Sequence, residues 1–172
     1  MKKFELTSEF VTFLGKKLFR IKALISFGNV KEGELGGFVE KEENLSNDGN
    51  AWVSDNARVS GNARVSGNAW VYGNARVYGN ARVSDNAWVY GDADYATVQG
   101  FGSEYRTTTF FRTKAGDIGV RCGCFYGTLE EFRAKVKETH GETKIAKEYL
   151  MVADLMEFRF SKGGSIDEKM GI

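Results

Sequence analysis

The chain has 172 residues, a formal net charge of +1 and a single histidine. The small net charge argues against strongly electrostatic attachment to nucleic acid or to a membrane surface, and no apolar run approaches the length of a membrane span. The opening Met1-Lys2-Lys3 has no apolar run behind it, so we expect a cytoplasmic protein made of one domain with an appendage.

Residues 1–34 are expected to form an N-terminal β cap. Apolar and polar residues alternate in 9–13 and 19–23, on either side of Gly15-Lys16-Lys17, a pattern typical of a hairpin with one buried face. The end of a stack of repeats exposes unpaired backbone and apolar core. A cap over this end would prevent association through the open edge.

Residues 35–98 are dominated by a six-residue repeat that is regular from Ala51 onward, [Gly/Asp]-[Asn/Asp]-Ala-[Trp/Arg]-Val-[Ser/Tyr]. Repetition at a short fixed period indicates a β-solenoid. Within each short strand, alanine and valine should face inward and the Trp or Arg between them outward. Trp52, Trp70 and Trp88 fall 18 residues apart, so three hexapeptides per coil would stack them on one face of a triangular prism.

Two local features of this region carry further expectations. Before Ala51 the register is irregular, because Lys41 and Asn47 would occupy inward positions, so a loop or register shift is expected between Gly36 and Asn50. The Gly-Asn, Asp-Asn and Gly-Asp pairs between strands suit corners with a left-handed backbone conformation.

The repeat resembles a known family. Runs such as Val59-Ser60-Gly61-Asn62-Ala63-Arg64 resemble the hexapeptide repeats of the left-handed parallel β-helix, although Ser or Tyr follows valine where the acyltransferase pattern often has a small or acidic residue. The segments 18–23, 36–40 and 44–46 resemble the lead-in of hexapeptide-repeat proteins of phages and prophages. The resemblance implies a mainly β fold, a left-handed parallel β-helix, and a trimer.

Residues 99–160 are expected to form a C-terminal hairpin plus two helices. Residues 107–113 and 117–125 resemble the arms of a hairpin, and Thr128-Leu129-Glu130-Glu131 is a capping box that opens a helix ending near Gly141. A second helix should bury its stripe of apolar residues, which are Ile145, Tyr149, Val152 and Met156. This unit should dock on the last coil, and residues 161–172 are expected to be a mobile tail.

The outward positions are the candidate binding or interface residues, namely Trp52, Trp70, Trp88, Tyr72, Tyr78, Tyr90, Arg58, Arg64, Arg76 and Arg82. An exposed column of tryptophans would be a seam for self-association, a face covered by the C-terminal unit, or a stacking site for a ligand. The arginine columns, one of which Asp94 would continue, either keep the surface soluble or hold a phosphate or carboxylate.

Catalysis is not expected. The only histidine, His140, lies outside the repeats near a helix end, so no Ser-His or Cys-His pair can be placed within the coils. Cys122 and Cys124 are expected to be reduced thiols, and one histidine is too few for the usual zinc sites. We expect no metal and no cofactor.

The sequence therefore favours a non-catalytic binding protein that self-associates. The phage-like resemblance suggests sequestration of a small anionic, nucleotide-like ligand or masking of a host partner, as an anti-defence protein would do. The alternatives are a hexapeptide-repeat acyltransferase and a purely structural or scaffold protein.

Overall fold

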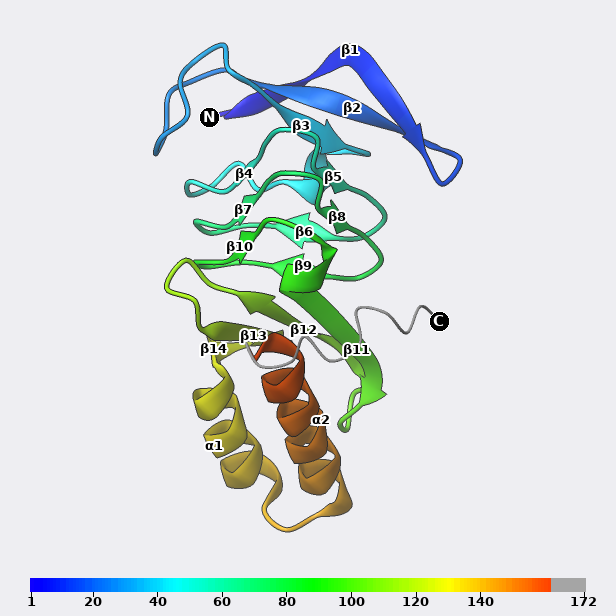
Figure 1. Cartoon of the computed structure of the whole chain (residues 1–172), viewed down its shortest axis with the longest axis vertical. Coiled ribbons are helices and arrows are strands. Elements are labelled where there is room, and N and C mark those ends of the chain that lie inside the picture. Colours follow the sequence, from blue (N-terminus) through cyan, green and yellow to red (C-terminus); the bar gives the residue numbers. More distant parts are fainter. Residues whose placement is uncertain (162–172) are drawn as a thin grey trace.

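The computed structural model describes residues 1–161, so the predicted tail, apart from Ser161, lies outside the described residues. Figure 1 shows an elongated molecule in which an N-terminal hairpin, a stack of short strands, a second sheet and two helices follow one another along the long axis. The structure is mainly β, with parallel strands in the middle and helices at the C-terminal end, as the sequence predicts.

The N-terminal hairpin continues directly into the repeats. Strands β1 (Phe4–Phe13) and β2 (Lys16–Ala23) pair antiparallel, which confirms the predicted hairpin. Strand β2 pairs antiparallel with β3 (Leu35–Val39), and β3 pairs parallel with β5 (Arg58–Val59). The cap and one face of the repeat region therefore share a single sheet, in the order β1-β2-β3-β5-β8.

The repeat region consists of two-residue strands that pair in parallel with equivalent strands along the stack. After β4 (Trp52–Val53) and β5 come β6 (Arg64–Val65), β7 (Trp70–Val71), β8 (Arg76–Val77), β9 (Arg82–Val83) and β10 (Trp88–Val89). The repeated alanines and valines are at most 1 % exposed, which confirms their inward orientation. Corner positions such as Asp55 (φ 54°) and Gly73 (φ 64°) have the left-handed backbone that the sequence predicts.

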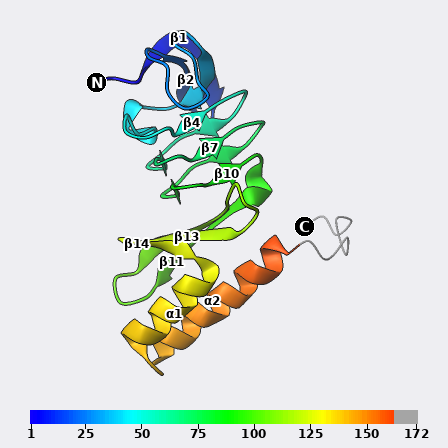
Figure 2. The same ribbon diagram turned by 90° about the vertical axis from the view of Figure 1, so that its left-hand side faces the viewer.

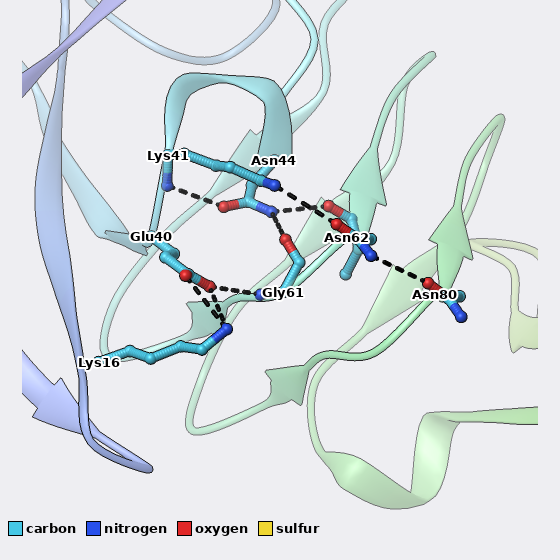
Figure 3. A network of polar contacts seen from close by, with 8 residues as sticks. Lys16, Glu40, Lys41, Asn44, Gly61, Asn62 and Asn80 are labelled. Atoms are coloured by element: carbon cyan, nitrogen blue, oxygen red, sulfur yellow. Dashed lines mark hydrogen bonds and ion pairs between the residues drawn. The ribbon is translucent and has the colours of Figure 1, made fainter.

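The first part of the stack contains the expected register shift. Phe38 pairs with Arg58 and Leu45 with Val65, twenty positions along the chain, whereas Trp52 pairs with Trp70, eighteen positions along. The short 3-10 helix η1 (Glu42–Asn44) precedes this change of register. In this short helix the buried Asn44 amide donates a hydrogen bond to the Gly61 carbonyl oxygen (3.2 Å), as Figure 3 shows. It also donates to the Ala63 carbonyl oxygen (2.8 Å).

The C-terminal unit is an antiparallel sheet with two helices. After the 3-10 helix η2 (Asp92–Asp94), the sheet runs β11 (Tyr95–Phe101), β12 (Arg106–Arg112), β13 (Ile118–Cys122) and β14 (Phe125–Thr128) in that order. Helices α1 (Leu129–His140) and α2 (Lys144–Phe160) follow, with the predicted capping box at Thr128 and the helix end at Gly141. Figure 2 shows the helices projecting from the sheet away from the repeats.

The boundary of the C-terminal unit lies earlier than predicted. The sequence placed residues 95–98 in the repeats, but they belong to β11, which pairs with β12. The reason is local: η2 turns the chain out of the repeat path, and Asp94 closes it by accepting hydrogen bonds from the N–H groups of Tyr90 and Gly91. Asp94 therefore does not continue an arginine column.

Strand β12 joins two hydrophobic cores. Phe111 lies fully buried in the core of the repeat region, whereas its neighbour Phe110 lies fully buried among residues of α1 and α2. Adjacent residues of a strand point to opposite faces, so one strand seals the last coil and supports the helices at the same time. The Lys114 N–H also donates to the Asn86 carbonyl (2.8 Å), and docking of this unit on the last coil is thus confirmed.

Candidate functional site

A hollow of about 570 Å³ lies where the repeats meet the C-terminal sheet. Three of its lining side chains are arginines, Arg82 from β9, Arg106 from β12 and Arg121 from β13. The other residues lining this arginine pocket are Asn62, Asn80, Thr107, Gly123 and Cys124. The pocket thus combines three guanidinium groups with amide and hydroxyl groups and contains no carboxylate.

Backbone pairing brings Arg82 and Arg121 together. The N–H of Arg82 donates a hydrogen bond to the Thr109 hydroxyl oxygen at 2.9 Å, which fixes β9 against β12. Thr109 is in turn the direct partner of Arg121 in the antiparallel pairing of β12 and β13. Residues that are far apart in the sequence therefore line one pocket because the sheet docks on the repeats in a defined register.

The turn at Gly123 leaves room for the third arginine. Gly123 has a φ of +57°, and a Cβ at this position would lie 2.4 Å from Nη1 of Arg106. A side chain here would strain the backbone and displace the guanidinium group. Glycine is therefore required both for the turn between β13 and β14 and for the position of Arg106.

The pocket arginines Arg82, Arg106 and Arg121 have no carboxylate partner in the described part of the chain, which is also true of Arg58, Arg64 and Arg159. Arg76 is bound by Asp92, and Arg112 by Asp94. Guanidinium groups that share a hollow repel one another unless an anion lies between them, so this arrangement suits a bound phosphate or carboxylate.

A row of asparagines extends from the pocket along the repeats. Asn62 donates from its amide to the Asn80 side-chain oxygen (3.4 Å) and accepts from the Lys41 ammonium (3.4 Å), as Figure 3 shows. Lys41 thus adds a fourth cation at the far end of this row. Because these amides are exposed and their contacts are long, they can turn toward a ligand at small cost.

The same network contains one carboxylate, that of Glu40, which binds a lysine and a backbone N–H group. Glu40 accepts a hydrogen bond from the Gly61 N–H (2.6 Å) and pairs with Lys16 (3.2 Å). The Gly61 N–H is the main cause that lowers the pKa of Glu40, although its partial burial opposes this effect. Glu40 is therefore ionised at neutral pH, and the charge of Lys41 contributes to the lowering of its pKa.

The structure confirms both predicted arginine columns, Arg58 with Arg76 and Arg64 with Arg82, but the members of each column have different surroundings. Arg82 lines the pocket, whereas Arg64, its partner in the β6–β9 pair, is exposed and lies outside it. Arg58 stacks over the Phe13 ring (5.4 Å to its centroid). Arg76 donates from Nε to Asp92 (2.8 Å), and its hydrogen bonds lower the pKa of Asp92 even though burial of that carboxyl acts in the opposite direction.

The three tryptophans form the predicted ladder but do not all face solvent. Trp52 is fully buried, Trp70 is half-buried and Trp88 is 38 % exposed. The expectation of an exposed column is wrong for Trp52, because the edge of the Phe27 ring packs against it (5.4 Å). At the other end of the ladder, the Lys114 ammonium lies over the Trp88 ring (5.4 Å).

The predicted tyrosines lie near the C-terminal end of the repeats. The Tyr72 ring packs against Tyr90 (5.1 Å between centroids) and against Trp88 (5.8 Å), while Tyr78 is 53 % exposed. The rings of Tyr72, Tyr90 and Trp88 form a small aromatic cluster on the outside of the repeats. None of the three tyrosines lines the arginine pocket. Tyr90 instead shares a second hollow with Arg58 and Arg76, so the structure brings one predicted tyrosine and two predicted arginines together there, where Asp92 also lies.

Of the residues considered for catalysis, His140 and Cys122 lie outside the arginine pocket, and Cys124 lies at its rim. His140 ends α1, with its ring 6.1 Å from the Tyr149 ring, and Cys122 contacts the Thr108 hydroxyl (3.2 Å) inside the C-terminal unit. Cys124 is exposed at the pocket rim. Both thiols are free, and within residues 1–161 no group of His, Cys, Asp and Glu is arranged to hold a metal ion.

Sequence reasoning missed two of the three pocket arginines. Arg106 and Arg121 belong to the C-terminal hairpin, which does not repeat, and the sequence places neither next to Arg82. The available signal was the predicted docking of this hairpin on the last coil. Once the pairing of β12 with β13 is known, Thr109 and Arg121 are seen to be direct partners across the two strands.

Comparison with known families identifies the repeat. A family model described as YdcK Beta solenoid repeat matches residues 51–67, 57–73, 69–83 and 75–91. Residues 51–91 therefore consist of β-solenoid repeats. No curated protein matches the chain. Within the described residues of this solenoid protein, helices α1 and α2 are both too short or too polar to cross a membrane.

Proposed function

We propose that this solenoid protein is a non-catalytic binding protein that holds a small phosphorylated or carboxylated molecule in the arginine pocket. The observation that supports it is the set of three guanidinium groups, Arg82, Arg106 and Arg121, that line one hollow without a carboxylate partner among residues 1–161. The guanidinium fork binds such anions through two parallel hydrogen bonds. The amides of Asn62 and Asn80 would accept or donate the remaining hydrogen bonds.

The size of the pocket favours a ligand larger than a single phosphate ion. Pockets of about 300–1,000 Å³ are typical of small-molecule sites, and the hollow of about 570 Å³ is within this range. A nucleotide-like molecule would engage several guanidinium groups with its phosphates. In the phage setting that the hexapeptide resemblance implies, sequestration of such a molecule would remove a signal from the host.

We also infer that the solenoid is a left-handed parallel β-helix of the hexapeptide type with 18-residue coils. The pairing of Trp52 with Trp70 and of Trp70 with Trp88 supports this interval. A trimer and the masking of a host protein stay predictions. The acyltransferase alternative would require a base near the pocket, and acyl transfer from acetyl-coenzyme A that is lost in His140→Ala would favour it.

The binding proposal is tested by calorimetric titration with ATP, ADP and pyrophosphate. We expect at least one of them to bind, and Arg82→Gln and Arg121→Gln each to weaken binding by about tenfold or more, since charge-assisted hydrogen bonds contribute roughly 1.5–3 kcal/mol. Arg58→Gln is the matched control, because Arg58 occupies the same repeat position on another face. Its effect should be below about twofold.

Two results would contradict the proposal. One is the absence of binding heat with all three anions at low salt, where electrostatic attraction is strongest. The other is binding that Arg58→Gln weakens as much as Arg82→Gln does. Alkylation of the exposed Cys124 provides a second measurement, because a ligand in the pocket should slow labelling at its rim.

A further inference from the structure

The outer face of α2 carries a stripe of large apolar side chains that nothing among residues 1–161 covers. Met151, Leu155 and Phe158 are 70 %, 57 % and 75 % exposed. Their spacing of four and then three residues places them in one line along the helix. The opposite face of α2 is also apolar, because Tyr149, Val152 and Met156 are buried against the sheet and α1.

A helix at a protein surface normally has one apolar face and one polar face. Helix α2 departs from this pattern, since its second apolar stripe points to solvent. Contiguous exposed apolar surface on a folded protein usually marks an interface. The stripe on α2 is the stronger candidate for a seam than the tryptophan ladder, because Phe27 already covers Trp52 and Lys114 lies over Trp88.

We propose that the stripe on α2 binds the same stripe of a second copy of this chain, with the two helices antiparallel about a two-fold axis near Leu155. In this arrangement Phe158 packs against Met151 of the partner subunit, and Leu155 packs near the axis. Two-fold symmetry makes the interface self-complementary, so a single stripe supplies both sides. The dimer needs no segment other than α2 for its apolar centre.

The charges beside the stripe complement one another in the antiparallel arrangement. Glu148 and Arg159 are eleven residues apart, about three helical turns, so they lie on the same side of α2 at opposite ends of the stripe. Neither forms an ion pair within residues 1–161. Antiparallel packing places Glu148 beside Arg159 of the partner subunit and repeats this pair at the other end. A parallel two-fold arrangement would instead place Glu148 and Arg159 on opposite sides of the seam from their counterparts, so these pairs could not form.

The size of the seam suggests a moderate affinity. Three large apolar side chains from each copy, with the stems of the flanking charged residues, give an interface near the lower limit of stable dimers, which is about 1,200 Å² in total. We therefore expect dissociation in the micromolar range. None of the residues lining the arginine pocket belongs to α2, so the dimer would carry two open pockets.

Sedimentation velocity of the full chain over a range of concentrations tests the seam. We expect a concentration-dependent dimer that Leu155→Glu or Phe158→Glu converts to monomer at every concentration. Leu14→Glu is the control, since Leu14 is 75 % exposed in the turn between β1 and β2. This variant should leave the dimer unchanged.

Charge-reversal variants distinguish loss of the dimer interface from damage to the fold of each subunit. Glu148→Arg and Arg159→Glu should each weaken the dimer about three- to tenfold by placing like charges together, and the double variant should restore the original affinity. A wild-type chain that stays monomeric up to about 100 µM would overturn the proposal. So would an oligomer that persists in Leu155→Glu but dissociates in Trp88→Asp, because its seam would then be the aromatic face.

Discussion

Lys3 shows how one buried charge ties the N-terminal cap to the first coil. Its side chain is 2 % exposed, and the ammonium donates hydrogen bonds to the carbonyl oxygens of Ala51 (2.9 Å) and Gly49 (3.3 Å). It also lies over the Phe27 ring at 4.7 Å. Burial lowers the pKa of Lys3 to about 8, although the charge of Asp48 acts in the opposite direction.

This pKa predicts a stability that rises between pH 8 and 10. The folded state releases the Lys3 proton at about pH 8, whereas the unfolded chain keeps it up to its ordinary value of 10.5. The unfolded state therefore binds more protons in this window, and raising the pH favours folding by at most about 2–3 kcal/mol. Urea unfolding at several pH values measures the slope, which Lys3→Met should remove.

The pH experiment on Lys3 needs a control lysine outside the core, and it must stay below the pH at which buried tyrosines ionise. Lys17→Met, in the exposed part of the same hairpin, should keep the wild-type slope. Above pH 10 the buried Tyr95 acts in the opposite direction, because burial raises its pKa to about 12 and its ionisation opposes folding. Equal slopes for the wild type and Lys3→Met below pH 10 would show that Lys3 does not titrate in the folded state.

At the scale of elements, parallel pairing in register predicts which deletions the solenoid tolerates. Deleting residues 62–79, one interval of eighteen, removes one strand from each parallel sheet and joins corners of the same type. Deleting residues 62–73 instead would move tryptophan positions onto arginine faces. We expect the first variant to fold cooperatively, with circular dichroism close to that of the wild type, and the second to lose most of its stability.

Changes in side-chain orientation cannot explain such a difference, because both deletions keep alanine and valine inward. Apart from their length, the two variants differ only in whether tryptophan and arginine positions stack on positions of the same type in the neighbouring coil. Similar melting temperatures for the two variants would therefore contradict a coil built from three hexapeptides. The shorter solenoid should also keep Arg82 beside the C-terminal sheet, because the deletion lies before this residue in the chain.

The sequence predicts elements well where they repeat or carry a local signal. The inward alanines and valines, the N-terminal hairpin and the capping box at Thr128 all depend on neighbours in the sequence, and the structure confirms them. Strand β14 and the early start of β11 depend on pairing with distant strands. The burial of Trp52 beneath Phe27 has the same origin, since no local pattern shows that this loop folds back over the ladder.

The candidate site was less predictable than the fold for the same physical reason. Arg82 stood out because it belongs to a column of the repeat. Arg106 and Arg121 lie in strands that look like any half-buried hairpin, and their position depends on how the sheet meets the last coil. A pocket between two units is a property of their docking, so their separate sequences do not reveal it.

At the scale of the whole molecule, β12 makes the two cores depend on each other. Phe111 and Phe110 are both fully buried, but they lie in different cores. Truncating either to alanine should destabilise the protein by about 3–5 kcal/mol. Hydrogen exchange should show which backbone amides lose protection in each variant. We expect faster exchange in the last coils of Phe111→Ala and in α1 and α2 of Phe110→Ala.

The two truncations should also differ in their effect on the arginine pocket. Phe111 contacts the position of Gly119 on β13, where an added Cβ would lie 2.3 Å from its ring. Loss of this ring should shift the sheet against the solenoid and weaken anion binding more than Phe110→Ala does. The same exchange pattern in both variants would show that the molecule unfolds as one unit and that the two cores are not separable.

The unequal burial of the tryptophans gives the protein a built-in set of optical reporters. Trp52, Trp70 and Trp88 occupy the same position in successive coils, yet their exposure increases from the N-terminal to the C-terminal end of the ladder. Trp52 should emit at the shortest wavelength and resist quenching by iodide, and Trp88 should emit at the longest and be quenched most easily. The colour of the remaining emission during unfolding would then tell from which end the solenoid opens.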